Sequence, residues 1–245
     1  MAQSDLTATA GRERVGSISD SGWERAGAAT GIASVLLFIG GFLIVPTPPD
    51  VNAPAAEVAA YFTEEQDGIR ATLVAFTAAL FFYIWFLGSL RSALWEAEGG
   101  SGRVSAIAFG AGLVGAAALF LLIDLLAAAA FRPAETSPEV TTALNDAAVV
   151  SGAPALAALT ALFAATAKVM LRSGVFPPWL GWLNAVAALA QPLAVGAMLT
   201  DSGAFAGDGA LGLFVPVFSF GIALGATSVV LIGRAGERAG PAPAQ

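Results

Sequence analysis

The sequence predicts an all-α, polytopic integral membrane protein with six transmembrane helices and one extra short amphipathic surface helix on the outer side. Two observations lead to this fold class. Of the 245 residues, 57% are hydrophobic and only 12% are charged, whereas a soluble chain carries roughly a quarter charged residues. The sequence also contains six long stretches without Lys, Arg or Glu, and each is long enough to cross the ~30 Å hydrocarbon core of a bilayer.

These six stretches are the expected membrane spans. Lipid offers the backbone no hydrogen-bond partners, so each stretch should form a helix that satisfies its own N–H and C=O groups. The first stretch exceeds the ~7–15 residue core of a signal peptide and follows a long polar segment, so we expect it to be retained as a helix. In order, the predicted spans are Ala26–Val45, Ala71–Leu90, Val104–Ala130, Ala147–Ala167, Leu180–Thr200 and Ala210–Ile232.

A surface helix is predicted between the first two spans. Prolines within residues 46–50 end the first helix. Four apolar residues then recur at the i, i+3, i+4, i+7 spacing of one helix face: Ala55, Val58, Ala59 and Phe62. This pattern predicts an amphipathic helix around residues 54–65 on the outer surface, with Tyr61 and Phe62 dipping into the membrane interface. Such a helix is either a packed extracellular lid or a gate for a ligand.

The distribution of basic residues predicts the orientation in the membrane. With both termini in the cytoplasm, nine of the eleven basic residues lie on the inner side and only Arg70 and Arg132 lie outside, as the positive-inside rule requires. Basic usage is ten Arg and a single Lys amid abundant Ala and Gly. That usage is typical of a GC-rich bacterial genome, so the expected location is the bacterial cytoplasmic (plasma) membrane. Four aromatic residues are the expected interfacial anchors: Trp95, Trp179, Trp182 and Tyr61.

Composition divides the chain into three segments. Residues 1–22 are rich in Ser, Thr, Gly and charge, and a segment of this kind is expected to be a disordered cytoplasmic tail. Residues 23–234 form the predicted six-helix transmembrane domain. Residues 235–245 end in the sequence Gly-Pro-Ala-Pro-Ala-Gln and should form a second, frayed cytoplasmic tail.

Polar side chains inside the spans are the candidate functional residues, because an ionisable group at the centre of a span costs about 2.5–3.5 kcal/mol on insertion scales. Asp124 precedes Phe131 by seven residues, which places it roughly 10 Å below the outer boundary. Thr77 and Gln191 reach a similar layer, and Arg70 and Asn184 share a helix face with them at a spacing of seven residues. An intramembrane polar cluster is therefore predicted from Asp124, Thr77, Gln191, Arg70 and Asn184. We expect Asp124 to face the bundle interior near the second span, with Arg70, Thr77 or Gln191 within reach.

Two interpretations of this polar layer are open. The polar groups either form interhelical hydrogen bonds, with Pro154 and Pro192 acting as packing kinks, or they line a water-filled or ligand-holding vestibule near the outer side. The face of Asp124 distinguishes the two, because a solvated cavity favours transport and a dry helix contact favours a structural role.

Several kinds of chemistry are excluded by residue type. The chain has no Cys and no His, which excludes disulfides, thiolate or imidazole metal sites, covalent haem and Cys–His catalysis. The GxGxxG spelling at residues 110–115 lies inside a span without a preceding strand, so it is a false match to a dinucleotide motif. No basic patch suits nucleic acid. We therefore expect no enzymatic activity, no metal and no cofactor, and the lipid bilayer as the main partner.

Three short elements carry a resemblance to a known group of proteins. They are Tyr61-Phe62 in the outer loop, the sequence FLGSLR at residues 86–91 and the sequence SGVFPPWLGW at residues 173–182. With these elements, the chain resembles uncharacterised bacterial multi-spanning membrane proteins of the domain-of-unknown-function type, over most of residues 26–234. The resemblance implies no activity, ligand or catalytic residue.

Two classes of function remain. The first is a multi-pass bundle without catalytic chemistry that binds a partner, assists assembly or senses a signal, with a protein partner or a homo-oligomer as its associate. The second is a secondary transporter or a membrane protein that binds a small molecule or ion in a polar pocket around Asp124, since buried polar groups and helix prolines are common in transporters.

Overall fold

Six apolar helices make up most of the molecule. The computed structural model describes the backbone of residues 2–46 and 48–238, and the side chains of residues 22–46 and 48–237. Within these residues every regular element is helical and there is no strand. Six helices are long and apolar enough to cross a membrane. The predicted all-α fold with six spans is therefore confirmed.

In the described residues, seven α-helices and three short irregular helices follow one another. In order, they are α1 (Ala2–Phe42), α2 (Ala55–Glu64), α3 (Gln66–Glu98), α4 (Arg103–Phe131), the 3-10 helix η1 (Pro133–Glu135), α5 (Pro138–Ser173), α6 (Pro178–Ala190), the 3-10 helix η2 (Gln191–Met198), the π-helix η3 (Ala210–Phe214) and α7 (Val215–Arg238). The fifth span combines α6 with η2, and the sixth combines η3 with α7.

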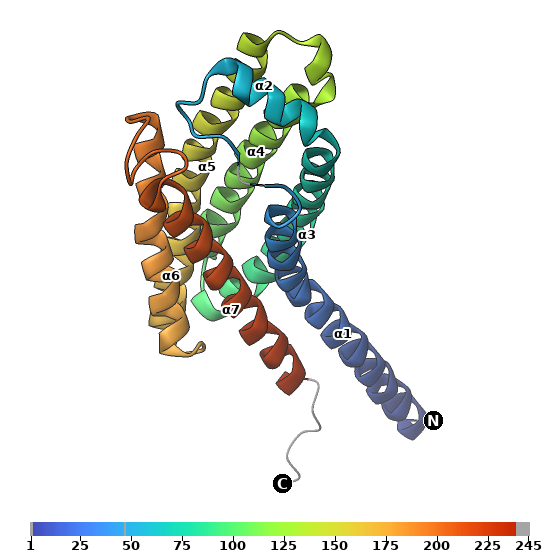
Figure 1. Ribbon diagram of the computed structural model, residues 1–245. Helices are drawn as coiled ribbons and strands as arrows, with labels where there is room; N and C mark the ends of the chain where they lie inside the picture. Colours follow the sequence, from blue (N-terminus) through green and yellow to red (C-terminus); the bar gives the residue numbers. More distant parts are fainter. Residues whose placement is uncertain (1, 47, 239–245) are drawn as a thin grey trace.

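Consecutive spans are neighbours in space, and the last span returns to the first (Figure 1). α3 packs between α1 and α4, α5 packs between α4 and α6, and α7 contacts both α6 and α1. The antiparallel pair α4–α5 has the most extensive contact. Glycines allow this close approach: a Cβ atom added at Gly115 would lie 2.6 Å from Cδ2 of Leu159. Small residues at helix contacts are the usual device for packing helices in lipid.

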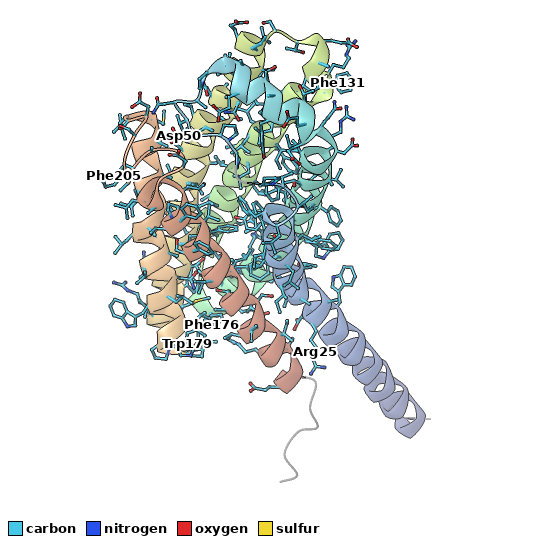
Figure 2. The ribbon with its side chains drawn as sticks, in the orientation of Figure 1. Arg25, Asp50, Phe131, Phe176, Trp179 and Phe205 are labelled. Carbon is cyan, nitrogen blue, oxygen red and sulfur yellow. The ribbon has the colours of Figure 1, made fainter. Side chains whose placement is uncertain are left out.

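The two ends of the bundle differ in residue type. Figure 2 shows Asp50 and Phe131 at the end that carries α2, and Arg25, Phe176 and Trp179 at the other. We call these the α2 end and the opposite end. Because consecutive spans alternate in direction, the loops after α1, α4 and η2 lie at the α2 end.

The centre of the bundle is built mainly on α3. Its side chains Tyr83, Phe86 and Leu87 are fully buried. The ring of Phe220 in α7 contacts the rings of Tyr83 at 5.6 Å and Phe163 at 5.9 Å, measured between centroids. Aromatic pairs at this spacing stabilise beyond simple contact. These rings join α3, α5 and α7 at one level of the bundle.

The predicted surface helix is present as α2, which lies across one end of the bundle (Figure 1). Val58 and Phe62 are buried, and α2 packs mainly against α5. Phe62 therefore faces the bundle, whereas the sequence pattern suggested that it dips into the lipid interface. The apolar spacing identified the buried face correctly. What it left open was whether protein or lipid would cover that face.

The ends of the chain differ in part from the composition-based expectation. The backbone of residues 2–22 is helical and continuous with α1, where a disordered tail was expected. α7 runs to Arg238, which includes the first residues of the expected C-terminal tail, and residues 239–245 lie outside the described part. The division into a 23–234 domain with two tails stays a prediction.

Candidate functional site

Two buried amide side chains on the fifth span each form a polar contact inside the bundle. Nδ2 of Asn184 lies 2.9 Å from the carbonyl oxygen of Leu180 and 3.3 Å from Oγ1 of Thr227 in α7. It also lies 3.7 Å from Sδ of Met170 in α5. Asn184 is 1% exposed, so these contacts replace water for an amide held in an apolar interior.

Gln191 forms the second contact, nearer the α2 end. Its Nε2 donates to the carbonyl oxygen of Pro216 at 3.1 Å and to Oγ of Ser219 at 3.0 Å. Gln191 is fully buried, and its Oε1 has no hydrogen-bond partner among the described residues. The backbone is irregular on both sides of this contact, since η2 begins at Gln191 and η3 precedes Pro216.

The two contacts have a common antiparallel register. Asn184 and Gln191 are seven residues apart on one face of the fifth span, and Thr227 and Ser219 are eight residues apart on α7. The contact between Asn184 and Thr227 therefore lies nearer the opposite end of the bundle than the contact between Gln191 and Ser219. We call these four residues the α6–α7 polar seam. Sequence reasoning identified the two amides but not the two hydroxyl groups, although their spacing on one face was a usable signal.

A small cavity lies beside the contact between Asn184 and Thr227. It is lined by side chains that include Phe86, Thr166, Asn184 and Thr227, and its volume is about 10 Å³. That is close to the smallest space that holds one water molecule. Oγ1 of Thr166 is buried there without a hydrogen-bond partner among the described residues. The cavity is too small for a substrate larger than water.

A larger, open groove lies at the α2 end, outside the seam. Its volume is about 460 Å³, and mainly apolar residues line it: Pro192, Leu193, Val195, Gly196, Leu199, Thr200 and Phe205. These residues come from η2 and the loop that follows it. The groove offers few groups for recognising a polar ligand.

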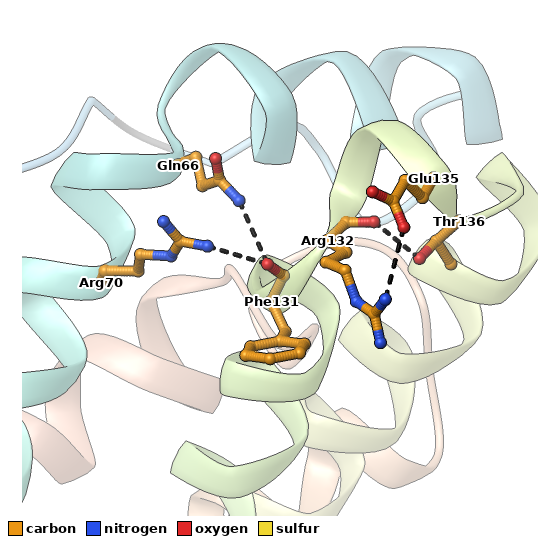
Figure 3. A network of polar contacts seen from close by, with 6 residues as sticks. All are labelled: Gln66, Arg70, Phe131, Arg132, Glu135 and Thr136. Atoms are coloured by element: carbon orange, nitrogen blue, oxygen red, sulfur yellow. Dashed lines mark hydrogen bonds and ion pairs between the residues drawn. The ribbon is translucent and has the colours of Figure 1, made fainter.

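Arg70 lies at the α2 end, where it binds the C-terminus of α4 (Figure 3). Its Nη2 donates to the carbonyl oxygen of Phe131 at 2.8 Å, and its Nη1 lies 3.7 Å from Oδ1 of Asp67. Gln66 donates to the Ala130 and Phe131 carbonyl oxygens from the same helix. The last carbonyls of a helix lack intrahelical partners and carry partial negative charge. The Phe131 carbonyl oxygen and the Asp67 carboxylate, and not Asp124, are the partners of Arg70.

Asp124 lies on the outer surface of α4, where its side chain is exposed. No hydrogen bond or ion pair joins it to another residue in the described parts of the chain. The expectation that Asp124 faces the bundle interior, with Arg70, Thr77 or Gln191 within reach, is therefore wrong. Residue counting gives the depth of a side chain in a span but leaves its direction around the helix axis open.

The predicted five-residue cluster is not formed. Thr77 is exposed on α3, and its Oγ1 donates to the Leu73 carbonyl oxygen of the same helix at 2.8 Å. Only Asn184 and Gln191 share a site, and that site faces α7. The outer-layer pocket around Asp124 is also absent in the described residues, because Asp124 faces away from the bundle.

The predicted aromatic anchors fall into two groups. Trp95, Trp179 and Trp182 lie at the opposite end with 55%, 55% and 64% of each residue exposed, as suits side chains in contact with headgroups. Tyr61 is half-buried instead, and its hydroxyl donates to the Pro46 carbonyl oxygen at 3.1 Å. Burial raises the pKa of Tyr61, and the negative charge of Glu65 raises it further. The hydroxyl thus stays protonated and holds α2 to the segment that follows α1.

Among the described residues, no group of three or more His, Cys, Asp or Glu side chains is arranged to hold a metal ion. Comparisons of the chain with protein-family models, with curated proteins and with solved structures each found no match.

Proposed function

We propose that this chain is a multi-pass bundle of a bacterial plasma membrane that has no catalytic role and acts by associating with another membrane protein. In that role it would serve partner binding, assembly or sensing. The observation that carries the proposal is the position of Asp124: an ionisable side chain faces outward from the half of α4 nearer the α2 end, within a candidate membrane span.

An ionisable side chain facing hydrocarbon is costly, and such residues nearly always face a bundle interior or a polar partner. Within this chain Asp124 has neither, because the described residues give it no hydrogen bond or ion pair. A contact with another protein supplies the missing partner. The interior supports the same conclusion, since the cavity beside the seam has room for about one water molecule.

The charge distribution supports the proposed orientation. In the described residues the opposite end carries Arg25, Arg91, Arg103, Lys168, Arg172 and Arg234. By the positive-inside rule that end faces the cytoplasm. The α2 end, with the surface helix and the groove, then faces outward.

A photo-crosslinking amino acid at Leu121 tests the proposal in intact membranes. Leu121 is 51% exposed and lies on the same outward side of α4 as Asp124. We expect a crosslinked product of discrete mass that contains a second polypeptide. The matched control is Ile222, which is 58% exposed on α7, and there we expect adducts with lipid only. Lipid adducts alone from both positions would contradict a role in association.

A secondary transporter is the second candidate, and one feature favours it. The fifth and sixth spans are interrupted by η2 and η3 beside the buried amide of Gln191, and interrupted helices beside polar groups are typical of transporter binding sites. This function would require the α6–α7 polar seam to open to water during turnover. The proposal of a structural seam requires it to stay closed.

A further inference from the structure

The outward side of α4 is a regular stripe that contains Asp124. Exposed residues recur there at alternating spacings of three and four, and they are Ile107, Gly110, Val114, Ala117, Leu121 and Asp124. Every second member of the stripe lies seven residues from the next, which puts Gly110, Ala117 and Asp124 in one row and the larger residues in another. A stripe with this period matches the seam of a left-handed helix pair.

We propose that α4 of two copies of this chain pack along this stripe, related by a two-fold axis along the membrane normal, and that the two Asp124 side chains share a hydrogen bond. This inference rests on the proposed function and names the partner as a second copy. Such a hydrogen bond requires one proton between the two carboxyl groups, which one group donates to the other. A charge-assisted O–H···O⁻ bond of this kind is stronger than a neutral one.

Symmetry is the reason for choosing a second copy. Two copies inserted in the same direction hold Asp124 at the same depth, and a parallel helix pair brings equivalent seam positions face to face. Each carboxyl group therefore meets, at its own depth, a group that can share a hydrogen bond with it. Gly110 and Ala117 lie in the same row, so the backbones approach closely enough for short side chains to meet.

The surface beside the stripe also suits protein better than lipid. Between Val150 and Leu171, α5 contributes none of the large apolar side chains that the other spans expose. Its outward residues there include Ala157, Ala161 and Ala164. Since α5 has the most extensive contact with α4, the stripe is flanked by a surface of small side chains. A second copy can approach this surface without steric clash.

Disulfide crosslinking tests the dimer. Because the chain has no native cysteine, only the introduced thiols can form the crosslink. Ala117→Cys places a thiol in the row of Asp124, two turns away. The protein is diluted into lipid vesicles until monomer dominates, so that the initial rate of disulfide formation follows the dimer population. We expect a reducible product of twice the monomer mass. Ile222→Cys, on the exposed side of α7, is the control, and its rate should stay at the level of random collision.

Substitutions of Asp124 in the Ala117→Cys background test the carboxyl pair itself. Asp124→Leu should lower the crosslinking rate roughly 3- to 15-fold, the range that corresponds to one hydrogen bond between membrane helices. Asp124→Asn, which pairs as an amide, should retain most of the rate. Because Asp124 is exposed, neither change should alter the thermal stability of the monomer, and that stability is measured in parallel.

The outcomes separate the two proposals. An Ala117→Cys rate no higher than that of Ile222→Cys overturns the dimer, and a higher rate that Asp124→Leu leaves unchanged overturns the carboxyl pair. If the Leu121 photo-crosslink then contains a different polypeptide, association with a partner stands and self-association falls. If it contains lipid alone, both fall.

Discussion

At the residue scale, whether an intramembrane polar side chain can bond to a neighbouring helix depends on its direction around its own helix axis. Asp124 was predicted from its depth and Asn184 from sharing a helix face with Gln191, yet Asn184 is 1% exposed and bonded across helices, whereas Asp124 faces outward. Depth follows from residue counting at ~1.5 Å per residue. Direction requires knowing which neighbours surround each helix, and a span that is apolar on all sides carries little of that information.

The α6–α7 polar seam should therefore contribute to stability where a hydroxyl that bonds only within its own helix, such as that of Thr77, does not. We expect Asn184→Ala to lower the free energy of unfolding by roughly 1–2 kcal/mol, because Thr227 loses its interhelical partner and a small void is left. Thr77→Ala is the matched control: its hydroxyl bonds only to its own helix, so a change below about 0.5 kcal/mol is expected. Unfolding in lipid bicelles measures both, and equal losses would contradict the distinction.

At the element scale, the sequence predicted the helices well and their irregularities only in part. Uncharged runs located all six spans, because a helix is the regular structure that satisfies a single backbone segment in lipid. Helices α3 and α5 extend to 33 and 36 residues, since charged residues near their ends reach beyond the apolar core. Pro154 and Pro192 indicated kinks. The 3-10 geometry of η2 and the π geometry of η3 depend on tertiary contacts that the proline pattern does not contain.

The π-helix η3 depends on a close backbone approach at Gly212. A Cβ atom added there would lie 2.1 Å from the carbonyl oxygen of Ala206 and 2.6 Å from that of Phe205. We expect Gly212→Ala to lower the free energy of unfolding by roughly 1–3 kcal/mol, because rigid backbone atoms must move. Gly221→Ala on α7 is the control, since it has open space within 4 Å. Unfolding curves of the two variants that coincide would argue against this packing.

At the scale of the whole molecule, the charge pattern and the chain path agree. The spans alternate, the surface helix α2 covers one end, and the described basic residues other than Arg70 and Arg132 lie towards the opposite end. Amphipathic spacing was enough to predict α2. The order of the spans around the bundle, and hence the pairing of α7 with both α1 and α6, was not predictable. The apolar helices are similar in sequence, and few of their residues indicate which neighbour each helix contacts.

The orientation follows from this pattern and is directly testable in a chain without native cysteine. Single cysteines are placed at Glu57, which is exposed on α2, and at Ser101, which is exposed in the turn between α3 and α4. A membrane-impermeant thiol reagent should label Glu57→Cys in intact cells and label Ser101→Cys only after the membrane is opened, because basic loops are retained in the cytoplasm. The reverse pattern would place the α2 end inside and would move Asp124 into the cytoplasmic leaflet. The same labelling of both sites in intact cells would mean that the chain inserts in two orientations, and parallel α4 pairing would then apply only to copies that share one of them.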